Sequence, residues 1–315
     1  MTIDFYDNEP CDPRLYLDLM KDSYAKTFDE AWFHWYNRKA PNGRSRIYFG
    51  VDSGSGKMVS SLTFLPVRVA YKGASHPGSI YVNAMTHPAY QGCGLNLRLL
   101  QSALADARRL GDKFSITFPA ASRMSVKGML KTGWVPICDI FYSALNRKPS
   151  EAHSAARRID SVDGRFDQLL ETFSARLDIG LFKDHRFLSW RVCERPDQDY
   201  ELYAVFNGEL PKGILVLKQY EEEKIRKTHI IELIGVDNTT ILDLLRLAER
   251  ESYLRNSDIL NIWLSEYSIY YDLLTDFGFV ASADKNTLMV HWHEDSMRLA
   301  GDNHMHFSLA DNDVY

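Results

Sequence analysis

The chain has few cysteines and no long apolar run. Cys11, Cys93, Cys138 and Cys193 are scattered, without the paired spacing of a metal site or a redox motif. We therefore expect reduced thiols in the cytoplasm and no bound metal. No apolar run reaches the length of a membrane-spanning helix, and the acidic residues 2–13 lack the basic and apolar regions of a secretory signal.

An excess of basic residues is also missing. The 315 residues carry a formal net charge of −5 at pH 7, which argues against a nucleic acid or an anionic membrane as partner. A 45% share of hydrophobic residues and a 25% share of charged ones are typical of globular proteins, and the length suits about two domains. We expect small-molecule partners, while the oligomeric state stays open.

The glycine-rich loops of nucleotide hydrolases and dehydrogenases are absent, because no Gly-Lys-Ser/Thr or GxGxxG pattern occurs where it would be needed. What is present is an apolar, strand-like run over 80–85, a loop over 88–94, and apolar residues at helical spacing over 95–107. A loop with glycines at a helix start exposes backbone N–H groups at a positive dipole end, which suits a diphosphate. Cys93 in this loop is a conceivable nucleophile, but no base is placed beside it, so a bystander is favoured.

The loop sequence Gln91-Gly92-Cys93-Gly94-Leu95-Asn96 resembles motif A of the GNAT (GCN5-related) acyltransferases, Gln/Arg-x-x-Gly-x-Gly/Ala. Gln91 and Gly94 match this signature, whereas Asn96 replaces the expected small residue. The lead-in from Thr86 to Pro88 also fits the family.

The order of the expected elements extends the resemblance over residues 15–145. One or two helices in 14–36 precede strands over 47–51, 58–65 and 67–71, then the central strand and helix, a strand over 113–118, a helix over 122–131 and a strand over 137–145. The resemblance implies an α/β (α+β) fold with a mixed, mostly antiparallel twisted sheet flanked by helices.

The second half of the chain repeats the first. Trp35 and Trp190, Pro41 and Pro196, and Tyr48 and Tyr203 are each spaced by 155 residues. Three matches in one register favour duplication. We therefore predict two tandem GNAT-like domains: an N-terminal domain over 1–147 with motif A, a linker over 148–162, and a degenerate domain over 163–315 that contributes to the acceptor pocket.

Motif A is missing from the second copy. Residues 234–240 contain one glycine, Gly235, at the wrong place. Asp237 is the expected N-cap of the next helix, where it would repel a diphosphate. We expect acyl-CoA to bind in the first half alone.

The resemblance implies a ternary complex in which an amine attacks the thioester of acyl-CoA directly. Backbone groups of Met85 and Thr86 would hold the pantetheine, amides of 92–97 the diphosphate, and an N–H near Met85 the developing oxyanion. The predicted coenzyme-binding residues are Met85, Thr86, Gln91, Gly92, Cys93, Gly94, Leu95, Asn96 and Leu97.

Several side chains that usually assist catalysis in the family are replaced. The position of a frequent tyrosine is Met129, and two positions of a glutamate or histidine are Ile80 and Val82. Positioning would then carry much of the rate. The candidate substitutes are His34, Asn83 and Tyr142, although for each of them a structural role is the favoured interpretation: His34 is more typical of a packed or surface histidine, and Tyr142 of a packed strand residue.

Proteins that N-acylate amino sugars on nucleoside diphosphates, often dTDP-linked amino-dideoxyhexoses in surface-polysaccharide pathways, are similar in their aromatic and acidic features. The sequence leaves the acyl chain open, but the side chains expected near the pocket, in 62–64 and 118–121, would admit acetyl or a short hydroxyacyl group such as 3-hydroxybutyryl. The candidate acceptor-binding residues are Trp35, Tyr36, Arg44, Arg46, Trp190, Arg191, Asp311 and Asp313. Core packing of the aromatic residues and a solvated tail at Asp311 and Asp313 are the simpler expectations.

Three alternatives remain open. The acceptor could be a peptide or a small amine, and the protein could bind acyl-CoA without catalysing transfer. A tRNA-dependent peptidyltransferase fits less well, because the chain has motif A and no basic excess.

Overall fold

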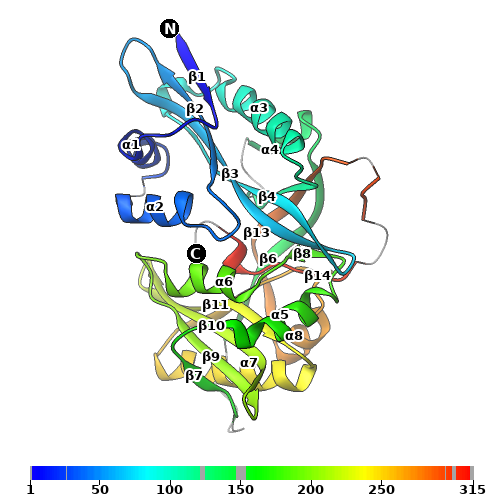
Figure 1. Cartoon of the computed structure of the whole chain (residues 1–315). Helices are drawn as coiled ribbons and strands as arrows, with labels where there is room; N and C mark the ends of the chain where they lie inside the picture. The colour runs from blue at the N-terminus through cyan, green and yellow to red at the C-terminus, as the bar shows by residue number, and fades with distance from the viewer. Residues whose placement is uncertain are drawn as a thin grey trace. The chain divides into compact units, whose positions relative to one another are not determined.

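The computed structural model describes residues 2–25, 27–120, 125–146, 154–294, 296–299 and 303–312 (Figure 1). The chain divides into two compact units. Unit 1 comprises 1–69, 76–137 and 288–298, and unit 2 comprises 70–75, 138–287 and 299–315. Within the described part, no helix is long and apolar enough to cross a membrane.

Unit 1 contains a sheet in the strand order β1-β2-β3-β4-β5-β13. Its strands are β1 (Ile3–Asp7), β2 (Arg46–Asp52), β3 (Met58–Tyr71), β4 (Ala74–Thr86), β5 (Phe114–Thr117) and the end of β13 (Val280–Trp292). β4 and β5 are parallel, whereas β1–β2, β2–β3 and β5–β13 are antiparallel. β3 is one continuous strand, so the predicted break between 65 and 67 is wrong, because Pro66 is accommodated within it.

Helices cover both faces of this sheet. They are α1 (Pro13–Tyr24), α2 (Glu30–Arg38), α3 (Leu95–Arg109) and α4 (Ser125–Lys131), and Figure 1 shows α1 and α2 on the opposite side from α3 and α4. The hydroxyl of Tyr16 on α1 lies 3.1 Å from the hydroxyl of Thr63 on β3. On the other face, Tyr48 of β2 donates a 3.1 Å hydrogen bond to Asp106 of α3.

The core of unit 1 lies between α3 and the sheet. The buried residues of α3 recur at helical spacing and are Leu95, Leu99, Leu100, Ala103, Leu104 and Ala107. They pack against Tyr48, Leu62, Phe64 and Tyr81 of the strands, with Trp134 beside them. The apolar stripe predicted from the sequence therefore holds motif A's helix against the sheet.

A chain of hydrogen bonds joins β4 and β5 where they pair. Ser79 and Ser115 hydroxyls lie 2.9 Å apart, and Ser115 lies 2.9 Å from Nε2 of His293, which follows β13. Burial, together with the neighbouring His291, lowers the pKa of His293 to about 3. His293 is therefore a neutral hydrogen-bonding group at neutral pH.

This depressed pKa predicts a loss of stability in acid. The unfolded chain protonates this imidazole near pH 6.5 while the folded chain does not, so stability falls as the pH drops from 6.5 towards 3. Between pH 7.5 and pH 5 we expect His293 to contribute about 2 kcal/mol of this loss. Urea unfolding of His293→Gln should show a shallower pH dependence, and an unchanged dependence would contradict this account.

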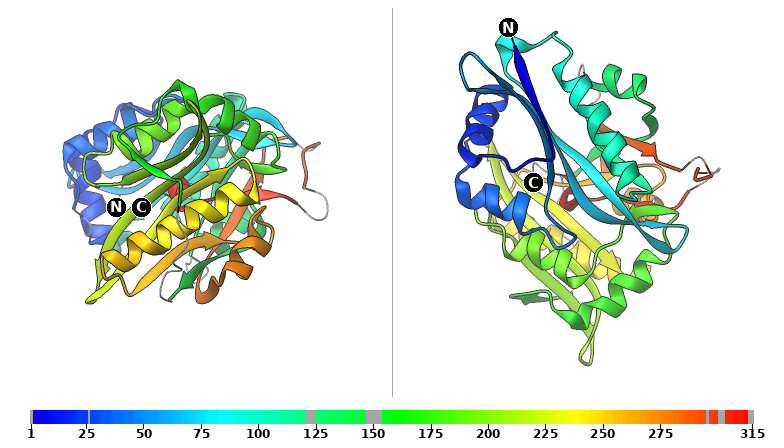
Figure 2. Two further views of the ribbon diagram at one scale, coloured as in Figure 1. Left: turned by 90° about the horizontal axis from the view of Figure 1, so that it is seen from below. Right: turned by 45° about the horizontal axis from the view of Figure 1, so that its top comes forward.

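Unit 2 contains a sheet in the order β6-β12-β11-β10-β9-β7. Its strands are β6 (Val135–Leu145), β7 (Arg157–Ile159), β9 (Glu201–Asn207), β10 (Leu210–Glu222), β11 (Ile225–Gly235) and β12 (Ile259–Leu264), with the short strands β8 (Ile179–Leu181) and β14 (Met305–His306) paired together. The helices are α5 (Asp167–Ser174), α6 (His185–Leu188), α7 (Asn238–Leu254) and α8 (Tyr271–Phe277). Figure 2 shows α7 lying along the strands, and it contacts β9 to β12.

The two halves of the chain share one order of elements, but the last strand of each half pairs with a strand of the other half. The order β2-β3-β4-α3-β5-α4-β6 in the first half matches β9-β10-β11-α7-β12-α8-β13 in the second. β6 nevertheless pairs antiparallel with β12, and β13 with β5. The predicted domain boundaries thus follow the repeats in the sequence, whereas the compact units alternate along the chain. Part of the predicted linker, 147–153, lies outside the described residues, and residues 157–159 of it form β7.

A buried ionic cluster holds the C-terminal segment in unit 2. Lys183 Nζ lies 2.5 Å from the carboxylate of Glu232 on β11, 2.8 Å from that of Asp311, and 2.9 Å from the hydroxyl of Ser308. His306 lies 2.8 Å from Glu232. Burial opposes the charge of Glu232, but Lys183 and His306 outweigh it and lower its pKa. For Asp311, burial raises the pKa against the pull of Lys183.

Removing the cation of this cluster should destabilise unit 2. Lys183→Met leaves buried carboxylates without their counter-charge, and we expect a loss of about 3–5 kcal/mol in the free energy of unfolding. Urea unfolding of Lys183→Met should be compared with Lys224→Met, which changes an exposed lysine of the β10–β11 turn. Equal stabilities of the two variants would show that the cluster contributes nothing.

Candidate acyl-CoA site

β4 parts from β5 in the middle of unit 1. The ladder between them runs from Gly78–Phe114 to Ile80–Ile116, yet β4 continues to Thr86. Asn83, with φ of 49°, interrupts the extended backbone of β4 just beyond this point. Asparagine tolerates this left-handed conformation better than most residues, but at a cost in strain. Among the described residues, the second part of β4 therefore has no ladder partner on the β5 side.

The other side of this segment is held in place. The N–H of His87 donates to the carbonyl of Val59 at 2.9 Å, and Ser60 donates its hydroxyl to the carbonyl of Met85 at 3.1 Å. Tyr24 at the end of α1 donates a 2.5 Å hydrogen bond to the carbonyl of Ala84. Three hydrogen bonds thus hold one side of the splayed segment, while its other edge has no strand partner among the described residues. Sequence reasoning missed Tyr24, because nothing local links it to a residue 60 positions away.

The loop after β4 delivers backbone donors to the start of α3. Gly92 and Gly94 have φ of 79° and 75°, which glycine adopts without strain. Gly94 is the N-cap of α3 and supplies no side-chain cap. In the described part of the chain, the N–H groups of residues 92–97 have no hydrogen-bond acceptor. This cluster of donors at a positive helix end is suited to an anion.

Side chains of the motif brace the loop. Gln91 Nε2 lies 3.5 Å from the carbonyl of Thr86, and Asn96 accepts a 3.2 Å hydrogen bond from the hydroxyl of Tyr81. The Asn96 contact ties α3 to β4 and gives a physical reason for its departure from the motif. Cys93 is exposed, and its thiol lies 3.9 Å from the carbonyl of Gln91.

In unit 2 two parallel strands also part, but side chains of the same unit bond to the freed strand and to the start of the helix that follows it. β11 pairs with β12 up to Ile230–Ile262 and continues to Gly235, whose N–H donates to the hydroxyl of Tyr270 at 3.2 Å. Glu232 on this segment belongs to the buried cluster of Lys183. The predicted N-cap is confirmed, since Asp237 accepts from the N–H of Thr240 at 2.8 Å. This bond lowers the pKa of Asp237 and keeps a negative charge at the helix start.

The predicted catalytic residues lie in different places. Asn83 sits on the splayed segment, is 7% exposed, and its Nδ2 has no hydrogen-bond partner within the described part. His34 lies half-buried on α2, with its ring 5.8 Å from that of Phe33. Tyr142 belongs to β6 in unit 2 and packs edge-on against Trp263. Of the three, Asn83 alone lies on the strand that parts from β5.

Most of the predicted acceptor residues in unit 1 are buried. Trp35 and Tyr36 are each 3% exposed. Arg46 is buried and its guanidinium lies 2.5 Å from the carboxylate of Asp112. Arg44 is exposed and lines a cavity of about 480 Å³.

The acceptor candidates of unit 2 are also engaged within the protein. Trp190 is buried, and Arg191 donates to the carbonyls of Ala310 and Asn312 at 2.8 and 2.7 Å. Asp311 is 3% exposed, so the expected solvated tail is wrong at this residue, because Lys183 draws it into the core. Asp313 lies outside the described residues.

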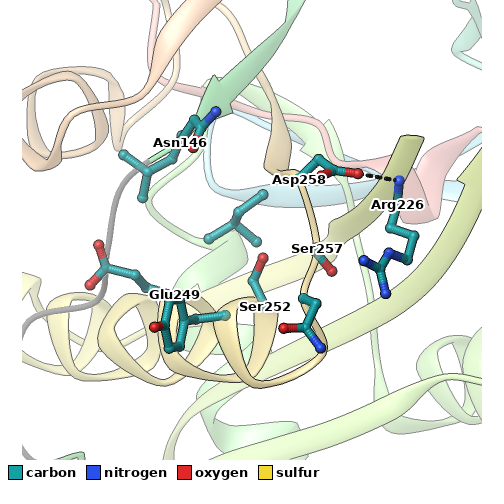
Figure 3. Close-up of a pocket in the computed structure, with 10 residues that line it drawn as sticks. Asn146, Arg226, Glu249, Ser252, Ser257 and Asp258 are labelled. Carbon is teal, nitrogen blue, oxygen red and sulfur yellow. Dashed lines mark hydrogen bonds between the residues drawn. The ribbon is translucent and has the colours of Figure 1, made fainter. Parts of the chain in front are cut away.

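A larger cavity, of about 590 Å³, lies in unit 2 (Figure 3). Its lining includes Asn146, Glu249, Ser252 and Asp258, and the carboxylate of Asp258 accepts from the N–H of Arg226. Residues 226, 258 and 260 belong to the starting ends of the parallel strands β11 and β12. Ligands of such sheets bind at the carboxyl ends, so this cavity does not correspond to the candidate site at the carboxyl end of β4 in unit 1. Among the described residues, no group of three or more potential metal ligands gathers to form a metal site.

Comparison with known families and structures agrees with this geometry. Residues 12–136 match the family profile described as acetyltransferase (GNAT) domain. No curated protein matches the chain.

Three solved structures are similar over most of the chain. A GCN5-related N-acetyltransferase from Anabaena variabilis shares 12% identity with a TM-score of 0.73, covering 93% of this chain and 73% of the other. A conserved protein from Enterococcus faecalis, described as a probable N-acyltransferase, shares 12% with a TM-score of 0.70 and the same coverage. N-myristoyltransferase from Saccharomyces cerevisiae with bound myristoyl-CoA shares 11% with a TM-score of 0.66, covering 92% and 82%. The predicted fold is confirmed: the chain has a GNAT-like α/β fold with a large, mostly antiparallel sheet flanked by helices.

Proposed function

We propose that the protein is an acyl-CoA-dependent N-acyltransferase whose coenzyme site lies in unit 1. The observation that carries this proposal is the splayed end of β4 beside the uncapped start of α3. The match of residues 12–136 to an acetyltransferase domain supports it, as does the similarity in fold to a protein with bound myristoyl-CoA.

In this proposal the coenzyme extends β4 on the side that β5 leaves open. Backbone groups of Met85 and Thr86 bind the pantetheine, as a strand partner would. The N–H groups of residues 92–97 bind the diphosphate, with the dipole of α3 adding to their positive potential. Gln91 keeps the loop folded back on Thr86, and Cys93 takes no part in the chemistry.

The reaction is a direct transfer. The lone pair of a neutral amine attacks the thioester carbon, the C–N bond forms, and the C–S bond breaks as the coenzyme leaves as a thiolate. The amine loses a proton to solvent or to a base, and the thiolate takes one up. A backbone N–H near Met85 stabilises the oxyanion. In this proposal Asn83, which is buried and whose amide nitrogen has no partner among the described residues, donates a second hydrogen bond to the oxyanion, while His34 and Tyr142 remain candidate proton carriers.

The acceptor we propose is the amine of a nucleotide-linked, dTDP-type amino-dideoxy sugar, and the group transferred is acetyl or a short hydroxyacyl such as 3-hydroxybutyryl. This part of the proposal rests on the sequence resemblance. Among the candidate acceptor-binding residues, Arg44 is exposed and could contact the sugar nucleotide. The internal contacts of Trp35, Arg46 and Arg191 favour the alternative acceptor, a peptide or a small amine, because an engaged side chain is less available to a substrate.

Blocking the diphosphate position should abolish coenzyme binding. Gly94→Val places a branched side chain among the free N–H groups and strains a left-handed position, so we expect the Kd for CoA to rise at least about tenfold, or about 1.4 kcal/mol. Gly56→Val is the matched control, since Gly56 has φ of 70° and, like Gly94, no atom within 4 Å of an added Cβ. Calorimetry showing normal CoA binding in folded Gly94→Val would remove the diphosphate site from this account.

Removing the amide of Asn83 should slow transfer without weakening coenzyme binding. We expect kcat to fall about 10- to 100-fold in Asn83→Ala, since an oxyanion donor contributes a few kcal/mol to the transition state. Asn83→Gly separates chemistry from conformation, because glycine keeps the positive φ and lacks the amide. Wild-type kcat in Asn83→Gly would assign the residue to backbone geometry alone.

Thiol release identifies the acceptor. Acetyl-CoA and 3-hydroxybutyryl-CoA should each be tested with dTDP-linked 3-amino and 4-amino dideoxysugars, peptides and small amines. We expect release that depends on one of the amino sugars. Release with peptides or small amines would replace the sugar by the alternative acceptor, and binding without any release would indicate a non-catalytic acyl-CoA-binding protein.

A further inference from the structure

The cavity of about 480 Å³ in unit 1 lies away from the splayed strand. It is formed where the segment after β1, the end of α2 and the start of β2 meet. Arg46, at the start of β2, faces Phe64 on β3, whereas Ser60 of β3 holds Met85. Four residues of strand, about 13 Å, separate these two levels of the sheet. The cavity is therefore distinct from the coenzyme site.

An unsatisfied amide marks this cavity. Asn37 lines it, is 2% exposed, and neither Oδ1 nor Nδ2 has a hydrogen-bond partner within the described part of the chain. Its backbone carbonyl, in contrast, accepts from the N–H of Ser45 at 2.9 Å. Leaving both atoms of a buried amide unpaired is costly, and an apolar residue would avoid the cost. This amide can be satisfied by a group that enters the cavity.

The charges around the amide favour an anion. Arg38 and Arg44 line the cavity and are exposed, as is the single carboxylate, Glu9. The Arg38 guanidinium lies 5.5 Å from the centre of the Phe33 ring, which keeps it near the cavity wall. Burial raises the pKa of Cys11 to about 12, so its thiol adds no negative charge. Arg46 adds no net positive charge to the cavity, because its guanidinium forms an ion pair with Asp112.

We propose that this cavity binds a small organic oxyanion, a phosphate or a carboxylate, carried next to a planar group with one hydrogen-bond donor and one acceptor. Arg38 and Arg44 bind the oxyanion, as guanidinium groups do in bidentate geometry. Asn37 pairs with the planar edge through both atoms of its amide. The volume is that of a small-molecule site. The proposal does not rest on acyl transfer, since binding here requires no coenzyme.

Calorimetry on the full-length chain without CoA tests this site with four probes. Inorganic phosphate and acetate carry the oxyanion alone, whereas UMP and N-carbamoylglycine add a planar edge with a donor and an acceptor side by side. We expect UMP or N-carbamoylglycine to bind at least fivefold more tightly than the matching simple anion. Preference for UMP over N-carbamoylglycine, or the reverse, identifies phosphate or carboxylate as the natural group.

Two variants separate the roles of the residues. In Asn37→Ala, the probes with a planar edge should bind no more tightly than the simple anions. In Arg44→Gln, the Kd of every probe should rise at least fivefold. Lys39→Gln is the control, because Lys39 is exposed beside α2 and does not line the cavity. Since Arg44 is exposed, its variant keeps the test valid even if Asn37→Ala fails to fold. No binding of any probe below 20 mM (roughly 2 kcal/mol), or binding unchanged in both variants, would mean that the cavity holds water and overturns the proposal.

Discussion

The parting of β4 from β5 is the constraint on which the functional architecture depends. A strand that loses its neighbour exposes a row of N–H and C=O groups, and such an edge must be paired, covered or used. In unit 1 the ladder ends at Ile80, and the remaining backbone of β4 is held from β3 by Ser60 and from α1 by Tyr24. No strand among the described residues pairs with the other edge, and these hydrogen bonds hold the segment without a ligand. Preorganisation of this kind lowers the cost of binding an extended molecule.

The two units show opposite solutions to the same problem. In unit 1 the glycines at 92 and 94 leave a helix start without a cap, and its donors lack acceptors in the described part. In unit 2 Asp237 caps the helix, Tyr270 bonds Gly235, and Lys183 joins Glu232 to the C-terminal segment. In unit 2 the corresponding positions thus form bonds within the protein. This contrast supports the proposal that the coenzyme binds in unit 1 alone.

Local features of the fold could be predicted from the sequence, and long-range ones could not. The strand, glycine loop and helix of motif A, the apolar stripe of α3 and the cap at Asp237 depend on residues close together in the chain. The exchange of β6 and β13 could not be found, because the alternation of a strand does not encode its partner. The same limit applies to Lys183, whose partners Glu232 and Asp311 are distant in sequence. The sequence therefore predicted Asp311 as part of a solvated tail.

For the candidate site residues too, local features could be predicted from the sequence and long-range contacts could not. Asn83 could be selected from its place before motif A, although its positive φ and unpaired amide required the structure. The sequence predicts Trp35 and Trp190 as equivalent residues of two repeats, and both are buried. Nothing in the sequence distinguished Arg44, which is exposed, from Arg46, which is bonded to Asp112. The charge of a residue can be read from a sequence, but its partner cannot.

Hydrogen exchange with and without CoA tests the central claim most directly. If the coenzyme binds along the splayed strand and at the start of α3, peptides covering 84–98 should become protected when CoA is added. The matched segment of unit 2, residues 231–241, should exchange equally in both states. Unchanged exchange over 84–98 under saturating CoA, or protection confined to unit 2, would contradict the assignment of the coenzyme site to unit 1.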